Sequence, residues 1–333
     1  MNQSTFEVTL IFTRFGSTQP LNALFFTATL LAYVFSIFAN VFLMLVIYFE
    51  SSLHKPMYIF LFNLAVNGLI GSSAVWPKVM ENLLSETQEG SFAACLVQVF
   101  CINFYATSAY TTLTVMAYDR YVSICKPLQY HSIMTPGKVK TLLTAANVIP
   151  LSSITVQVYL TSRLPLCRFS IHKLFCDNLA LVNLACVKSP LVDLFGIFVT
   201  VSLVVLPFVI VLLSYARILA VSLKASKEAQ KKALGTCSPH LITFVNFSLA
   251  ILFSVIYNRI NAFLLGHVNT FMSVHFILTP PLLHPIIYGI RTKEIRQRVI
   301  KLLWKRRDFA KTRDFLHAGF RPQMPPAVIH SDG

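Results

Sequence analysis

The sequence predicts an all-α membrane protein, a seven-transmembrane helix bundle followed by a short amphipathic eighth helix. Of the 333 residues, 55% are hydrophobic and 12% are charged. Such a composition gives a water-soluble domain too little polar surface to cover its core. The apolar residues gather in stretches of about 20, the length that crosses a hydrocarbon layer of about 30 Å, and the charges lie between these stretches.

Seven stretches are long and apolar enough to cross a bilayer. In chain order they are Leu24 to Phe49, Met57 to Trp76, Cys95 to Tyr118, Val139 to Leu160, Leu191 to Leu213, Leu241 to Tyr257 and Thr270 to Ile290. They divide the chain into an extracellular tail (1–23), the bundle (24–290), an amphipathic helix (291–306) and a disordered cytoplasmic tail (307–333). The first stretch is too long for a secretory signal, so we expect it to target the chain without cleavage.

The amphipathic helix is predicted from apolar residues at helical spacing with basic residues on the other face. These apolar residues are Ile295, Val299, Leu302 and Leu303. Such a helix lies in the membrane interface and is attracted by anionic lipid; the alternative is a soluble charged tail. From Arg307 the chain is polar and contains several prolines, and we expect no fold there.

The positions of Lys and Arg predict the orientation. The chain has 28 of them against 13 acidic residues, a net charge of +15. With the N-terminus outside, 21 of the 28 fall on the cytoplasmic side, where positive loops are retained. We therefore expect a multi-pass plasma-membrane protein with an extracellular N-terminus, which carries a glycosylation sequon at Asn2. Nucleic-acid binding is excluded, because no basic face is interleaved with exposed aromatics.

The cysteines agree with this orientation, because only the outer side is oxidising. Four of the seven fall at or beyond outer helix ends: Cys95, Cys167, Cys176 and Cys186. Four cysteines allow three pairings, and the spacing does not choose among them. Free buried thiols are the alternative.

Catalysis, cofactor binding and metal binding are not indicated. Charge inside a membrane usually marks transport, proton relay or catalysis, yet of the 13 acidic residues only Asp119 and Asp193 approach a span, and both lie at its ends. Paired carboxylates, an HExxH motif and a Gly-rich phosphate loop are all missing. A channel or transporter is the alternative from another class, although the paired half-sequences of transporters are not found.

Four motifs occur in the order of a known receptor family. Residues 116–125 read Met-Ala-Tyr-Asp-Arg-Tyr-Val-Ser-Ile-Cys, with Lys-Pro-Leu-Gln-Tyr following. The other motifs are Pro56-Met57-Tyr58, Lys232 to His240, and Pro285-Ile286-Ile287-Tyr288. From Asn40 to about Arg298 the chain resembles the odorant receptors of the rhodopsin-like (class A) G-protein-coupled receptors, in their fish-like, class I style.

This resemblance implies a receptor that binds a small odorant in the outer half of the bundle. Activation would move the sixth helix outward and engage a stimulatory, olfactory-type heterotrimeric G protein. The resemblance also implies that Cys95 pairs with Cys176 and Cys167 with Cys186. A non-olfactory chemosensor of the same superfamily is the nearer alternative.

Three residues depart from the family pattern. Gly68 stands where an aspartate is usual, Ala109 where many odorant receptors have a glutamate, and His284 where an asparagine is usual. A buried sodium ion needs oxygen ligands and preferably a carboxylate. We therefore expect no sodium site in the middle of the bundle.

Two helix faces predict the ligand pocket. In the third span, Asn103, Ala106 and Thr107 share one helix face at spacing i, i+3 and i+4. In the sixth span, Ile251, Val255 and Arg259 share one at spacing i, i+4 and i+8. The resemblance implies that both faces point inward. The candidate ligand contacts are Ile102, Asn103, Ala106, Thr107, Ile251, Val255 and Arg259. Mostly small and aliphatic residues predict an apolar cavity with few polar anchors.

Arg259 is the candidate anchor for a carboxylate-bearing or amino-acid-like ligand. It resembles the outer helix-six arginine of class I odorant receptors, and a guanidinium offers a planar fork of donors. The alternative is an arginine that extends to lipid headgroups. Asn103 can instead bond a neighbouring helix, and Ile102, Ile251 and Val255 can be packing residues.

The switch is expected at the inner end. Asp119 can hold Arg120 by a charge-assisted hydrogen bond in the resting state; the alternative is a plain interfacial ion pair. The resemblance implies that activation frees Arg120 for the G protein, with Tyr215 and Tyr288 steadying it. The further coupling residues that it implies are Tyr121, Leu128, which would insert into the partner, and His240.

Overall fold

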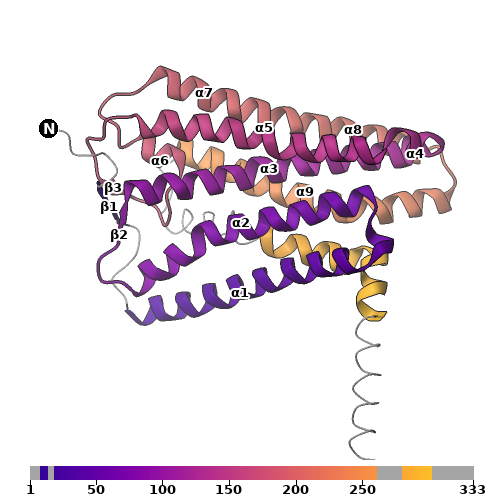
Figure 1. The fold of residues 1–333 in the computed structure, drawn as a ribbon, viewed down its shortest axis with the longest axis horizontal. Coiled ribbons are helices and arrows are strands. Elements are labelled where there is room, and N and C mark those ends of the chain that lie inside the picture. Colours follow the sequence, from indigo (N-terminus) through magenta and orange to yellow (C-terminus); the bar gives the residue numbers. More distant parts are fainter. Residues whose placement is uncertain (1–7, 14–18, 261–279, 302–333) are drawn as a thin grey trace, which may run out of the picture.

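The helices lie side by side in an elongated bundle (Figure 1). The computed structural model describes residues 8–13, 19–260 and 280–301; the side chains of 19–21 and 253–260 are outside this description. In the described ranges, six helical segments are long and apolar enough to cross a membrane. The chain is thus a mostly helical, multi-pass membrane protein, as its composition predicts.

The six spans follow the predicted order. They are α1 (Gln19–Phe49), α2 (Pro56–Leu84), α3 (Phe92–Cys125), α5 (Pro136–Ser162), the continuous series α7 (Pro190–Thr200), η4 (Val201–Val205) and α8 (Leu206–Ser222), and α9 (Lys227–Ile260). The predicted seventh span falls partly on residues outside the description, as do Asn2 and the tail at 307–333. Residues 280–291 are helical, and a second helix covers 293–301.

Several helices are longer than the apolar stretches. Helix α2 continues past Trp76 to Leu84, and α9 begins at Lys227 rather than at Leu241. Hydropathy finds the part of a helix that lies in lipid, whereas the helical hydrogen bonds continue into its polar ends. Pro239, which the sequence placed before the sixth span, therefore lies inside α9.

Prolines and capping residues mark the helix starts. Pro56, Pro136 and Pro190 stand in the first turn of α2, α5 and α7, where the missing N–H has no helical partner in any case. The Ser91 hydroxyl accepts the N–H of Ala94 at 3.1 Å and caps α3. The polar residues between the apolar stretches thus fix where each helix begins.

The fifth span contains a π-helical turn. It covers Val201–Val205, and Pro207 follows in the first turn of α8. Proline has no N–H to donate, and its ring crowds the preceding turn of an α-helix. A wider turn relieves this crowding and rotates the residues before it relative to those after it.

Helix α3 forms the core of the bundle. It packs against α2, α5, α8 and α9, and its Tyr105, Tyr110 and Leu113 are almost completely buried. At Gly71 of α2, an added Cβ would lie 2.6 Å from the ring of Tyr105. Only glycine allows α2 and α3 to approach this closely.

A small sheet covers one end of the bundle. Strand β1 (Thr9–Phe12) pairs antiparallel with β2 (Glu89–Ser91) and parallel with β3 (Ser170–Ile171). Leu10 and Phe12 alternate with exposed neighbours and pack on a cluster around Phe92. The sequence of the N-terminal tail does not predict this strand, because four alternating residues are too few to indicate one.

Two disulfides lie at this same end, which we call the disulfide end. They join Cys95 to Cys176 and Cys167 to Cys186, the pairing that the resemblance implied. Together they constrain the loop between α5 and α7, which includes β3 and the short helix α6 (Asn178–Val182). The other three cysteines are free.

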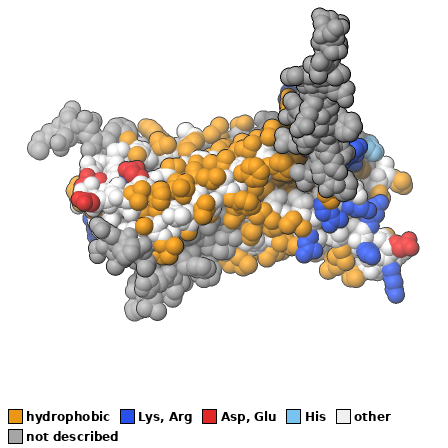
Figure 2. Space-filling view, turned by 90° about the horizontal axis from the view of Figure 1, so that it is seen from below, with side chains coloured by type: hydrophobic (Ala, Val, Ile, Leu, Met, Phe, Trp, Pro, Cys, Tyr) orange, Lys and Arg blue, Asp and Glu red, His pale blue; other side chains and the backbone are white. Residues whose placement is uncertain are grey.

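The surface is divided into three zones (Figure 2). On the face in view an apolar belt covers the middle of the bundle; acidic side chains appear at the disulfide end, and Lys and Arg gather at the other, the basic end. Large side chains such as Phe38, Val97 and Leu213 are more than half exposed in the belt. A belt of this size is far larger than the apolar patches of soluble monomers and fits a lipid environment.

Candidate functional site

A cavity of about 240 Å³ lies near the disulfide end between α3, α5, α7 and α9. Five of the seven candidate ligand contacts line it: Ile102, Asn103, Ala106, Thr107 and Ile251. The other two, Val255 and Arg259, lie on α9, but their side chains are outside the described residues. The structure thus brings the predicted face of the third span and Ile251 of the sixth to one hollow.

Aliphatic side chains form half of the cavity lining, nine of its eighteen described residues. They include Ile154 of α5 and Val192 and Val199 of α7. Phe175 and Leu179, from the loop before α7, also line the cavity. Apolar walls of this kind bind small molecules by burial of apolar surface, with few directional contacts.

The loop segment over the cavity is fastened to α3. Cys176 forms a disulfide with Cys95 of α3. The backbone N–H of Cys176 donates to Oε1 of Gln98 at 2.7 Å, and Nε2 of Gln98 donates to the carbonyl of Ala74 at 2.8 Å. These contacts fix the loop relative to α2 and α3 and so preserve the shape of the cavity.

Sequence reasoning missed several polar groups of the cavity. They are Gln157 on α5, Asp177 and Asn178 at the start of α6, and Asp193 and Thr200 on α7. Asp193 was noted only as an acid at a span end. An inward-pointing polar residue in a lipid-embedded helix was the available signal for Gln157, but the apolar pattern of α5 does not define which face is inward.

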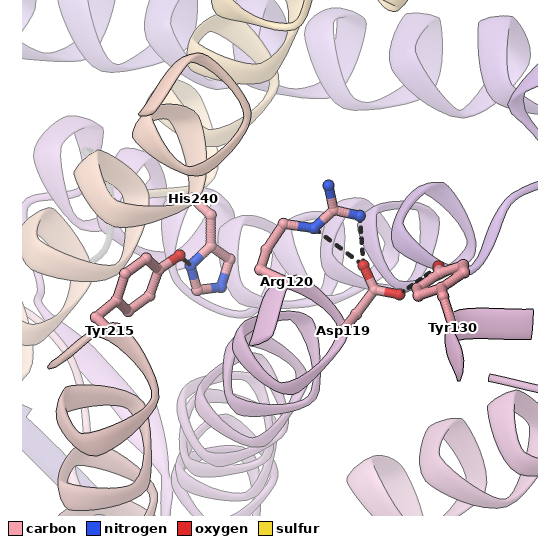
Figure 3. A network of polar contacts seen from close by, with 5 residues as sticks. All are labelled: Asp119, Arg120, Tyr130, Tyr215 and His240. Carbon is pink, nitrogen blue, oxygen red and sulfur yellow. Dashed lines mark hydrogen bonds and ion pairs between the residues drawn. The ribbon is translucent and has the colours of Figure 1, made fainter. Parts of the chain in front are cut away.

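A second polar group lies at the basic end, around Asp119 (Figure 3). Asp119 is completely buried. Nε of Arg120 donates to its Oδ2 at 3.0 Å, Nη2 of Arg120 donates to the same oxygen, and the Tyr130 hydroxyl donates to Oδ1 at 2.8 Å. Both carboxylate oxygens are therefore occupied, and Arg120 is turned toward Asp119.

Tyr130 is positioned by the turn that follows α3. The short helices η3 (Pro127–Gln129) and α4 (Tyr130–Ile133) bring its ring back beside Asp119. Burial, and then the negative charge of Asp119, raise the pKa of the Tyr130 phenol. The phenol therefore keeps its proton and remains a hydrogen-bond donor.

His240 links three helices at this end (Figure 3). Its Nε2 lies 2.9 Å from the carbonyl oxygen of Leu113 on α3, and its Nδ1 lies 2.6 Å from the hydroxyl of Tyr215 on α8. A carbonyl only accepts, so Nε2 carries the proton and Nδ1 accepts from Tyr215. These contacts hold α9 against α3 and α8.

The remaining coupling candidates are divided between core and surface. Tyr288 is buried, Tyr121 is partly buried, and Leu128 is fully exposed. Among the described residues, no hydrogen bond joins Arg120 to Tyr215 or Tyr288. The helix at 293–301 is held to the end of α1 by an ion pair between Arg298 and Glu50 at 3.2 Å.

Comparison with known proteins identifies the chain. The model of the family described as Olfactory receptor matches residues 29–306. The chain belongs to the olfactory receptor family. It is 36% identical to Olfactory receptor 52K2 of Homo sapiens over 272 residues, 81% of this chain and 87% of that protein. It is 35% identical to Olfactory receptor 52K1 of Homo sapiens over 277 residues, which are 83% of this chain and 88% of that protein. It is 32% identical to Olfactory receptor 6K3 of Homo sapiens over 303 residues, which are 90% of this chain and 90% of that protein.

Family membership defines the general function of this olfactory receptor. It is a G-protein-coupled receptor, which is not an enzyme, so the alternative of a channel or transporter is set aside. The seventh span, part of which lies outside the described residues, is expected from the family fold.

Proposed function

We propose that this olfactory receptor binds small, carboxylate-bearing or amino-acid-like odorants in the cavity and activates a stimulatory, olfactory-type heterotrimeric G protein. The observation that supports this most is that one helix carries both sites. Asn103 and Thr107 of α3 line the cavity, and Asp119 and Arg120 of α3 form the polar group at the basic end. A change at one end of α3 can therefore bias the other.

The disulfide end is proposed to face the outside of the cell, because disulfides persist in an oxidising environment. The basic end then faces the cytoplasm, in agreement with retention of positive loops. In this orientation in the plasma membrane, residues 1–23 are extracellular with Asn2 as the glycosylation site. Residues 291–306 lie on the inner leaflet, and 307–333 form a cytoplasmic tail.

The proposed resting state keeps Arg120 bonded to Asp119. Outward movement of the inner end of α9 must separate His240 from the Leu113 carbonyl, because these atoms hold α9 to α3. The same movement releases the Tyr215 hydroxyl, which can then steady a freed Arg120 together with Tyr288. A ligand drives this change only by its higher affinity for the active state.

Two surface features support G-protein contact at the basic end. Leu128 is completely exposed between α3 and α4, where an apolar side chain has no partner within the described chain. Tyr121 adjoins Arg120 and is only partly buried. We propose that Leu128 inserts into the G protein once Arg120 becomes available.

Filling the cavity tests the ligand site. The receptor would be expressed with a stimulatory olfactory G protein and screened for cyclic AMP against acids, amines, amino acids and neutral volatiles. Ala106→Phe should remove the response to every active compound. Val97→Phe, at an exposed position of the same helix outside this cavity, is the matched control and should leave the responses intact. An undiminished response of Ala106→Phe at normal surface density would contradict the site.

Arg259→Ala tests the proposed carboxylate anchor in the same assay. Loss of a charge-assisted contact should raise the concentration for half-maximal response by about tenfold for carboxylates, with little change for neutral odorants. Equal losses for both classes would favour an arginine that extends to lipid headgroups.

A further inference from the structure

A strip of polar residues runs along one wall of the cavity. Asp193, Gly196 and Thr200 of α7 all line it and share a helix face at i, i+3 and i+7. Gln157 of α5 reaches toward this strip: its Nε2 lies 3.8 Å from the place of a Cβ on Gly196. The glycine leaves room for the amide against α7. We call Asp193, Gln157 and Thr200 the polar wall.

The Gln157 amide lines the cavity and is available to a ligand. The residue is 9% exposed, and no hydrogen bond of its side-chain amide to another described residue is found. Its amide atoms are not among the fully buried polar atoms without a partner, so they are open to the cavity. A ligand that fills the cavity excludes water from this amide, and a polar group of the ligand restores its hydrogen bond, so the cavity favours ligands with a polar group here.

The hydroxyl and carboxylate groups of the cavity lining act as acceptors. The Thr200 hydroxyl donates to the Gly196 carbonyl at 2.8 Å, and the Thr107 hydroxyl donates to the Asn103 carbonyl at 2.7 Å. Each hydroxyl oxygen is then left as an acceptor only. The Asp193 carboxylate can only accept as well, whereas the side-chain amides of the lining can both donate and accept, so a hydrogen-bond donor of the ligand finds a partner in all of these groups.

The charge of the cavity lining favours a ligand donor that is positively charged. Asp177 is neutralised, because its Oδ2 pairs with Lys173 and its Oδ1 accepts the N–H of Ala180 at 2.7 Å. Asp193 has no ion pair among the described residues. No Lys, Arg or His is among the described residues that line the cavity. The described lining therefore carries one uncompensated negative charge.

We infer that the polar wall binds an ammonium group, so that the ligand is an amine or an amino-acid-like molecule rather than a simple carboxylic acid. This inference rests on the proposed function of the cavity. Asp193 supplies the opposite charge, and Gln157 and Thr200 supply further acceptors. A carboxylate on the same ligand is left to the proposed anchor Arg259.

Four probes with the same six-carbon chain separate the possible polar groups. Norleucine carries an ammonium and a carboxylate, hexylamine only an ammonium, hexanoate only a carboxylate, and hexanol neither. Cyclic AMP would be measured against concentration for each at the receptor coexpressed with its G protein. Norleucine and hexylamine should act at lower concentrations than hexanol and hexanoate.

Asp193→Asn tests the charge of the wall. It should raise the concentration for half-maximal response about tenfold for norleucine and hexylamine. The same concentration should stay nearly unchanged for hexanol and should fall for hexanoate. Glu89→Gln removes one negative charge from the exposed strand β2 at the same end, outside the cavity, and should change none of the four responses. A purely structural role of Asp193 at the start of α7 would shift all four probes equally.

Gln157→Met tests the amide with little change in volume. It should weaken the responses to norleucine and hexylamine, while surface density stays the same, because the amide has no hydrogen bond to another described residue that could be lost. A fall in surface density with equal losses for all probes would assign Gln157 a structural role and overturn its place in the wall.

The inference is overturned if hexanoate or hexanol is the most potent probe, or if neither ammonium-bearing probe raises cyclic AMP. Failure of the proposed function looks different. In that case no compound of any class raises cyclic AMP at a receptor that reaches the surface, whereas persisting responses to hexanoate or hexanol leave the receptor function standing.

Discussion

The two ends of the bundle are held together by different kinds of bond. At the disulfide end, two covalent cross-links and a three-stranded sheet fasten the loop over the cavity. At the basic end, the contacts are hydrogen bonds that side chains of α4, α8 and α9 make with one another, with Asp119 of α3 and with the Leu113 backbone carbonyl of α3. The first end keeps its shape when a ligand arrives, and the second can change partners.

The two kinds of bond also differ in how they stabilise the fold. Loop closure over the 81-residue separation of Cys95 and Cys176 destabilises the unfolded chain by about 4.5 kcal/mol, and closure over the 19 residues between Cys167 and Cys186 by about 3 kcal/mol. A hydrogen bond contributes about 1 kcal/mol net. A ligand with a modest preference for the active state can exchange hydrogen bonds of this size, whereas it cannot break the covalent cross-links of the disulfide end.

Breaking the covalent end should have the largest effect. Cys95→Ser should nearly abolish delivery to the cell surface, because the loop and sheet lose their link to α3. Flow cytometry on an N-terminally tagged receptor measures this. Cys101→Ser removes a free thiol from the same helix and should be delivered normally; normal delivery of Cys95→Ser would contradict the structural role of the bond.

Arg120→Ala should abolish ligand-evoked cyclic AMP and leave surface density largely intact. Removing the guanidinium removes the group proposed to engage the G protein, while Asp119 keeps its bond from Tyr130. Cyclic AMP would be compared at matched surface density. Preserved signalling would count against the assigned role of Arg120.

His240→Ala should raise basal cyclic AMP without ligand. It removes the contacts to the Leu113 carbonyl and to Tyr215, about 2 kcal/mol in all, or roughly a thirtyfold shift toward the active state. Thr236→Ala, an exposed position one turn earlier in α9, is the control. An unchanged basal signal would show that these contacts do not restrain α9.

Tyr130→Phe should give the smallest change, a rise in basal cyclic AMP of up to about fivefold. It removes one hydrogen bond to Asp119, worth about 1 kcal/mol, and leaves the bond from Arg120 in place. The response should keep its ligand selectivity, because Tyr130 lies at the opposite end from the cavity. A change in selectivity would mean that the two ends are not separable.

Much of this arrangement is predictable from residue spacing. The spans follow from apolar length, and Asn103, Ala106 and Thr107 follow from helical periodicity once the inward face of α3 is known. The partner of Arg120 is its neighbour Asp119, so their ion pair is local. These features are predictable because the residues involved lie within a few positions of each other in the sequence.

Contacts between distant segments were not predictable. Strand β1 pairs with residues 89–91 and 170–171, and the carbonyl that His240 bonds belongs to Leu113. Gln157 was missed for another reason: lipid is as apolar as the protein core, so apolar residues cover both the inner and the outer faces of α5. The hydrophobic pattern therefore does not reveal which of its polar residues faces a ligand.

The π-helical turn at Val201–Val205 determines how far the residues of α7 are rotated about the helix axis relative to those of α8. Removing one residue from it would restore ordinary helix and rotate one half by about 100° relative to the other. With Tyr215 still facing His240, Asp193 and Gly196 would turn away from the hollow. Deleting one residue of this turn other than Val204, which lines the cavity, should thus uncouple recognition from response.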